Sequence, residues 1–211
     1  YMYSYPHKTA YRPLEGIWLE DYLPALAGGG HSLPIHIPFC QSKCGYCNLF
    51  SVTGQSDEFM SAYVDAMERQ AEQLRTIIPE GADFSDLTLG GGTPLLLSEK
   101  QLQRVFSIAR DRMGFEGETI IVETSPAQTT EEKAALLKEN GVIRVSMGVQ
   151  SFDDAELRAL NRCHRPEQFH RPARILKKNK FPCINLDLIY GIPGQTVESL
   201  LDSARQAAAY E

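Results

Sequence analysis

The feature that most constrains this fold is a regular alternation of short apolar runs with amphipathic segments, which starts near residue 33. The apolar runs are short enough for buried strands, and the segments between them have apolar residues at helical spacing. Alternating strands and helices are typical of a parallel sheet with helices outside it. We therefore predict an α/β fold, specifically a partial (β/α) barrel built from five strand–helix units. The predicted strands cover residues 33–37, 86–89, 119–123, 142–149 and 183–189, and the predicted helices cover residues 58–77, 98–112, 130–140, 153–160, 166–178 and 196–210.

Single residues mark several helix ends. Ser98 is a good N-cap, Pro166 suits a first helical turn, and Gly141 suits the position just past a helix. A barrel needs at least one more strand after residue 211, because the last predicted strand would otherwise present an open edge. We therefore expect this chain to be the N-terminal part of a longer protein.

Residues 1–32 differ in composition from the remainder of the chain. They are rich in Tyr, Pro and Gly, including Tyr1, Tyr3, Tyr5, Tyr11 and a run of three glycines at 28–30. Such a segment is typical of an extended arm that packs by its aromatic side chains. We predict an irregular N-terminal arm over residues 1–32 and a core over residues 33–211.

Composition narrows the class of function. The chain has 211 residues, 43% of them hydrophobic, and a net charge of −6, so it can bury a core but has no basic surface stripe for nucleic acid. No apolar run reaches membrane-spanning length, and the N-terminus lacks a signal-peptide pattern. We predict a cytoplasmic protein with no nucleic-acid partner and no membrane span.

Three of the five cysteines lie within eight residues, at Cys40, Cys44 and Cys47. In a reducing compartment, clustered thiols more often bind metal or do redox chemistry than form disulfides. Three thiolates at this spacing can bind three irons of a four-iron cluster and leave the fourth open. A structural zinc site is the weaker alternative, since it usually needs two Cys-x-x-Cys pairs or added His. Cys163 and Cys183 stand alone, and we predict that both are buried small hydrophobes.

Polar and glycine residues gather at the ends of the predicted strands. The cysteine cluster, the run 90–94, Glu123, Gln150 and Asp187 all lie at or just past a strand end. In parallel barrels that edge is where active sites are built. The sequence therefore predicts a single site to which several strands contribute.

The motifs at these positions resemble a known family. They are His36 to Cys40 with the cysteine spacing that follows, Gly90 to Pro94, Gly148 to Phe152, Arg162 with His164, and Asp187 to Thr196. From about residue 33 onwards the chain resembles the radical S-adenosylmethionine superfamily. More narrowly, it resembles the oxygen-independent coproporphyrinogen III oxidase family, which also includes heme chaperones, heme-degrading methyltransferases and cyclopropanases.

The resemblance implies a 4Fe-4S cluster and S-adenosylmethionine as cofactors. Cys40, Cys44 and Cys47 would be the metal ligands. The positions that match cofactor-binding residues of the family are Tyr46 near the adenine, Gly91, Gly92 and Thr93 near the methionine amino group, Glu123 between methionine and ribose, Gln150 and Asp187 at the ribose, and Arg162 at a carboxylate. The resemblance also implies a deoxyadenosyl radical, a flavodoxin-like electron donor and a small-molecule substrate, with a tetrapyrrole as the leading expectation.

Two positions depart from the oxidase pattern. The oxidases carry Tyr six residues before the first cysteine, where this chain has Pro34, and a further cysteine after the third, where it has Asn48. Three functions therefore stay open: a coproporphyrinogen oxidase-like radical enzyme, a HemW-like heme chaperone that binds cluster and S-adenosylmethionine without oxidase activity, and a radical methyltransferase or cyclopropanase.

Overall fold

The computed structural model describes residues 12–13 and 15–210 and centres on a five-stranded parallel sheet. The strand order β1-β4-β5-β6-β7 follows the order along the chain, so each strand lies beside its predecessor in sequence. Parallel neighbours need a crossover connection, and helices supply it here. The predicted α/β fold of parallel strands with outer helices is confirmed. The strands are β1 (His31–Ile37), β4 (Phe84–Gly91), β5 (Thr119–Thr124), β6 (Arg144–Gln150) and β7 (Cys183–Leu188).

Two further strands were not predicted. β2 (Phe39–Cys40) and β3 (Val52–Thr53) form a separate two-stranded parallel sheet. Cys40 ends β2, and the loop that follows it, residues 41–51, contains Cys44 and Cys47; we call this segment the cysteine loop. Strands of two residues carry no periodicity, so the sequence gives no signal for them.

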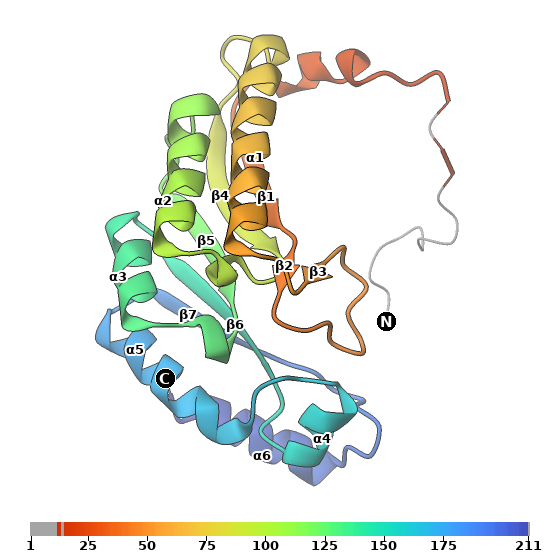
Figure 1. Ribbon diagram of the computed structural model, residues 1–211, viewed down its shortest axis with the longest axis vertical. Helices are drawn as coiled ribbons and strands as arrows, with labels where there is room; N and C mark the ends of the chain where they lie inside the picture. Colours follow the sequence, from red (N-terminus) through yellow and green to blue (C-terminus); the bar gives the residue numbers. More distant parts are fainter. Residues whose placement is uncertain (1–11, 14, 211) are drawn as a thin grey trace.

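Helices α1, α2 and α3 lie in chain order along one side of the sheet (Figure 1). The helices are α1 (Asp57–Ile77), α2 (Glu99–Ser107), α3 (Glu131–Glu139), α4 (Asp154–Ala159), α5 (His170–Lys178) and α6 (Val197–Ala208). Short 3-10 turns cover Leu19–Asp21, Leu23–Leu26, Pro94–Leu96, Pro126–Gln128 and Pro166–Phe169. Ser98 caps α2 as predicted, since its hydroxyl accepts from the Gln101 N–H. The predicted α-helix through residue 112 instead ends at Ser107 and continues as a π-helix, Ile108–Arg112.

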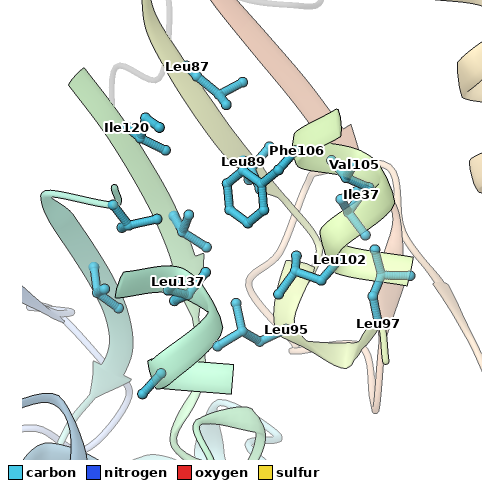
Figure 2. Packing of buried hydrophobic residues seen from close by; sticks show 14 of the residues in the cluster. Ile37, Leu87, Leu89, Leu95, Leu97, Leu102, Val105, Phe106, Ile120 and Leu137 are labelled. Atoms are coloured by element: carbon cyan, nitrogen blue, oxygen red, sulfur yellow. The ribbon is translucent and has the colours of Figure 1, made fainter. Parts of the chain in front are cut away.

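The core lies between the sheet and these helices. Leu89 of β4 lies beside Phe106 of α2 (Figure 2), and Leu87 and Leu102 belong to the same cluster; none of the four is more than 1% exposed. Each fully buried side chain of this size contributes roughly 1.5–3 kcal/mol of transfer free energy. The apolar residues of β7, one of the two edge strands, are only partly buried. The core is therefore densest under β1, β4, β5 and β6.

The prediction that the isolated cysteines are buried is wrong. Cys163 and Cys183 are both exposed. Cys183 is the first residue of the edge strand β7, and Cys163 follows α4 in a loop.

The described part of the arm contains two 3-10 turns and exposes Trp18 and Tyr22, which are 69% and 59% accessible. The tyrosines at positions 1, 3, 5 and 11 lie outside the described residues. The division into an arm over 1–32 and a core over 33–211 stays a prediction. No helix in the described ranges is long and apolar enough to cross a membrane.

Candidate metal and cofactor site

A cavity of about 200 Å³ lies where the carboxyl ends of β4, β5, β6 and β7 meet the cysteine loop. The structure brings every predicted site residue to this one cavity. These residues are Cys40, Cys44, Tyr46, Cys47, Gly91, Gly92, Thr93, Glu123, Gln150, Arg162 and Asp187. Their individual roles stay predictions, but their convergence is a property of the fold.

At its first end, the cysteine loop is attached through the backbone. Gly92 N–H donates to the Ile37 carbonyl and Thr93 N–H to the Phe39 carbonyl, both at 2.8 Å. A Cβ on Gly92 would lie 2.6 Å from the Phe39 oxygen and 2.9 Å from the Cys40 sulfur. Only glycine permits that approach. The glycine run therefore holds Cys40 against the end of β4.

The three clustered cysteines are free and half-buried. Burial raises the pKa of the Cys40 thiol, the Thr93 and Ser51 hydroxyls oppose that rise, and Cys44 and Cys47 add to it. Thiolates are the donors that iron–sulfur clusters use, so the donor set fits the cluster. Within residues 12–13 and 15–210, no three His, Cys, Asp or Glu side chains are placed to hold a single metal ion. A cluster does not require such a group, since its thiolates bind separate irons.

At Cys44, the same loop is attached mainly by side chains. Arg162 Nη1 donates to the Cys44 sulfur at 3.2 Å, and Asn161 Nδ2 donates to the Lys43 carbonyl at 3.0 Å. Gly45 N–H donates to the Leu160 carbonyl at 2.9 Å. All three partners follow one another directly at the end of α4.

The carboxylates of Glu123 and Asp187 and the guanidinium of Arg162 line the cavity, so it carries charges of both signs. The pKa of Glu123 is raised overall. Burial is the main cause and the nearby Asp187 carboxylate adds to it, whereas the Gly91 N–H, which donates to Glu123 at 3.2 Å, opposes the rise. Arg162 also donates to the Gly148 carbonyl. This arrangement suits a ligand that carries both a carboxylate and cationic groups.

The end of β6 has an unusual backbone. Gln150 has a φ of 75°, and a Cβ on Gly148 would lie 2.7 Å from Nε2 of the Gln150 side chain. His164 is buried and hydrogen-bonds to the Val149 backbone, while burial and the nearby Arg162 lower its pKa to about 4. His164 is therefore neutral at physiological pH and supports the strand end that carries Gln150.

A buried carboxylate links two loops behind the cavity. Glu156 of α4 accepts hydrogen bonds from Ser151 Oγ at 2.6 Å, Ser199 Oγ at 2.5 Å and Gln195 Nε2 at 2.9 Å. Gln195 in turn binds the Gly191 N–H and the Ile189 carbonyl. Glu156 thus connects the loop after β6 to the loop after β7.

Sequence reasoning missed several residues that line the cavity. They are Gln41, Ser42, Lys43, Leu49, Ser51, Thr124, Ser125, Ser146, Gly148 and Cys163. Ser146 had a usable signal, because it is a polar residue between the buried apolar residues Val145 and Met147 of its strand. Ser51 and Ser125 had none, since loop serines are common and their direction depends on the chain path.

The fold and site define the class first: a parallel α/β protein with a cysteine-lined cofactor cavity at the carboxyl ends of its strands. The family model described as the radical SAM superfamily matches residues 34–207. The chain therefore belongs to the radical SAM superfamily. Its cofactors are those of the superfamily, a 4Fe-4S cluster and S-adenosylmethionine.

Among known proteins, the chain is similar to oxygen-independent coproporphyrinogen III oxidases and to HemW heme chaperones. It is 31% identical over 210 residues to the oxygen-independent coproporphyrinogen III oxidase of Bradyrhizobium diazoefficiens, which covers 97% of this chain and 46% of that protein. It is 36% identical over 173 residues to the heme chaperone HemW of Lactococcus lactis, which covers 80% of this chain and 43% of that protein. The chain spans less than half the length of these relatives.

Solved structures agree with the sequence comparisons. Coproporphyrinogen III oxidase (HemN) from Escherichia coli matches with a TM-score of 0.83 and 29% identity, over 92% of this chain and 46% of that one. Native anSMEcpe with bound AdoMet matches with a TM-score of 0.57 and 18% identity, over 84% of this chain and 49% of that one. At that identity the second match shows a shared fold alone.

Proposed function

We propose that this chain is the cofactor-binding core of a radical enzyme of the coproporphyrinogen III oxidase type, acting on a tetrapyrrole. The observation that carries this proposal is the convergence of three cysteines, a glycine run, two carboxylates and an arginine on one cavity. Those groups come from the ends of β4, β5 and β7, from the loop after α4 and from the cysteine loop, and the radical SAM chemistry needs all of them at one place.

Each group has a role that its chemistry suits. Cys40, Cys44 and Cys47 would hold the cluster through their thiolates. When bound and reduced, the cluster would supply the electron for reductive cleavage of S-adenosylmethionine, the chemistry that would let the enzyme remove a hydrogen atom from its substrate. Glu123 would attract the cationic amino group, and Arg162 would bind the carboxylate.

The remaining contacts would orient the nucleoside. Gln150 and Asp187 offer an amide and a carboxylate to ribose hydroxyls. Tyr46 is half-buried beside Cys47 and would lie near the adenine. We further propose a flavodoxin-like electron donor and a cytoplasmic location, which the low potential of such clusters and their need for reduced thiols support.

A HemW-like heme chaperone is the second candidate. Pro34 and Asn48 replace the oxidase tyrosine and the extra cysteine, which favours it. The extent of the alignments favours the oxidase. Matches to coproporphyrinogen oxidases span 97% to 99% of this chain, whereas matches to HemW span 80% to 84%. The N-terminal arm, residues 1–32, makes up about the same share of the chain as this difference in coverage.

Anaerobic reconstitution of the full-length protein with iron and sulfide tests the proposal. We expect about four irons per chain by chemical analysis, an electron paramagnetic resonance signal after reduction, and deoxyadenosine when S-adenosylmethionine is added. Uptake of zinc with no iron would refute it. Conversion of coproporphyrinogen, run beside a heme titration, separates the candidates: turnover without tight heme binding identifies the oxidase type, and the reverse identifies the chaperone.

A further inference from the structure

The short segment that ends α4 contacts the cysteine loop with three residues in a row. Leu160, Asn161 and Arg162 bind Gly45, Lys43 and Cys44 respectively, at 2.9, 3.0 and 3.2 Å. Arg162 already has a predicted cofactor role. The residue before it has none, although its amide reaches across to a loop 118 positions earlier in the chain.

Asn161 has a backbone conformation that asparagine and glycine share. Its φ is 52°, in the left-handed region. The Asn161 N–H donates to the Arg158 carbonyl and the Arg162 N–H to the Leu157 carbonyl, at 3.0 and 2.9 Å. This is the Schellman end of a helix, with Asn161 at the position that glycine usually takes.

The left-handed turn is what aims the next residue at the site. It reverses the chain direction after α4, so that Arg162 points back to both the Gly148 carbonyl and the Cys44 sulfur. The Asn161 amide binds the Lys43 carbonyl at the same time. One residue therefore fixes the peptide next to Cys44 and the approach of the arginine to that cysteine.

The helix end alone does not account for an asparagine here. α3 ends in the same Schellman pattern with Gly141, and α5 places Lys180 in a left-handed conformation at the matching position. Glycine adopts this conformation without steric cost, so it would serve the helix at least as well. What asparagine adds is the amide donor to the cysteine loop.

We propose that Asn161 is a positioning residue for the cluster-binding loop: its amide holds the Lys43 carbonyl so that the Cys44 thiolate keeps its place beside Arg162. The inference rests on the proposed cluster function. It predicts that removing the amide while keeping the left-handed backbone loosens the cysteine loop but does not weaken the end of α4.

The test compares Asn161→Gly with Lys180→Gly in the full-length protein. Both changes put glycine at a left-handed helix end, but only the first removes a contact to the cysteine loop. In metal-free protein, the alkylation rate of Cys44 by iodoacetamide is followed by mass spectrometry, with exposed Cys183 as the internal standard. In reconstituted protein, the rate of iron loss to a chelator is followed by absorbance.

For Asn161→Gly we expect both rates to rise about fivefold, the factor that corresponds to one ordinary hydrogen bond. We expect its melting temperature to stay equal to that of the parent or to rise, because glycine suits the helix end. Lys180→Gly should match the parent in both rates. Asn161→Asp keeps a residue that tolerates the left-handed turn but lacks the donor, so it should resemble Asn161→Gly.

Equal rates in Asn161→Gly and the parent would overturn the proposal, and so would equal increases in Asn161→Gly and Lys180→Gly. A parent protein that takes up no cluster would instead defeat the proposed function. The alkylation measurement would still decide the role of Asn161 in that case, since it needs no metal.

Discussion

The segment from Cys40 to Cys44 is attached differently at its two ends. At Cys40, backbone hydrogen bonds join Phe39 and Ile37 to Gly92 and Thr93, next to the dense core under β4. At Cys44, attachment depends largely on the side chains of Asn161 and Arg162, both outside the sheet. The first end is therefore fixed by the fold itself. The second end depends on residues that can be changed without disturbing the sheet, which makes it the adjustable part of the site.

Removing the sulfur at the adjustable end should have the largest effect. We expect Cys44→Ala to abolish cluster uptake, because the remaining two thiolates cannot replace the third ligand. Iron and sulfide analysis after anaerobic reconstitution measures this. Cys163→Ala and Cys183→Ala should keep the parent iron content, since neither residue belongs to the proposed ligand set. Equal iron retention in Cys44→Ala and Cys163→Ala would contradict the ligand assignment.

A methyl group at position 92 should disturb the attachment at Cys40 for a steric reason. In Gly92→Ala the new methyl would lie 2.6 Å from the Phe39 oxygen, so backbone atoms must move. Overpacking of this kind costs about 1–3 kcal/mol. We expect cluster content to fall by more than half, together with a lower melting temperature.

Gly45→Ala is the matched control for that change. A Cβ on Gly45 would meet the Leu160 oxygen at 3.6 Å, which is ordinary contact, and the Gly45 N–H would keep its hydrogen bond. Its cluster content should match the parent. If both alanine variants lost the cluster equally, the distinction between the two ends would be wrong.

Much of the fold could be predicted from the sequence because it rests on periodicity. The five sheet strands and six helices gave clear patterns, and caps such as Ser98 were visible as single residues. The convergence of Glu123, Gln150 and Asp187 followed from the rule that parallel strands end at the same edge. Those expectations needed only local spacing and one topological rule.

What the sequence could not give was contact between distant segments. Nothing near Asn161 indicates that it binds a loop 118 residues away, and nothing near Gly92 indicates that it abuts Cys40. The prediction that Cys163 and Cys183 are buried failed for the same reason, since burial depends on which elements cover a position. The π-helix after Ser107 likewise has no pattern that separates it from an α-helix.

Glu123 offers an electrostatic test that leaves both loop ends intact. We expect Glu123→Gln to weaken S-adenosylmethionine binding roughly tenfold, the cost of losing one charged hydrogen-bond partner. Because the pKa of Glu123 is raised above its ordinary 4.5, its carboxylate becomes protonated earlier as pH falls. Parent affinity should therefore decrease on acidification, whereas the glutamine variant should show no matching loss.

Calorimetric titration of both proteins with S-adenosylmethionine between about pH 4 and about pH 8 measures this, and the ratio of affinities cancels effects on the cluster. The ratio should be largest at high pH and approach one as Glu123 becomes neutral. A ratio that stays constant across the range would show that the charge of Glu123 does not act on the cofactor.

The smallest effect on the cofactor should come from Glu156, which acts behind the cavity. In Glu156→Gln the amide cannot accept all three hydrogen bonds from Ser151, Ser199 and Gln195, so the loop after β7 should loosen. We expect S-adenosylmethionine affinity to fall by about fivefold or less, in line with an indirect loss of about 1 kcal/mol. Cluster content should be unchanged, because both attachments of the cysteine loop remain. Asp154→Asn on the same helix is the control, since its exposed pair with Arg158 contributes little. Loss of the cluster in Glu156→Gln would mean that the loop after β7 supports the cysteine loop as well, and the two attachments would then not be the complete set.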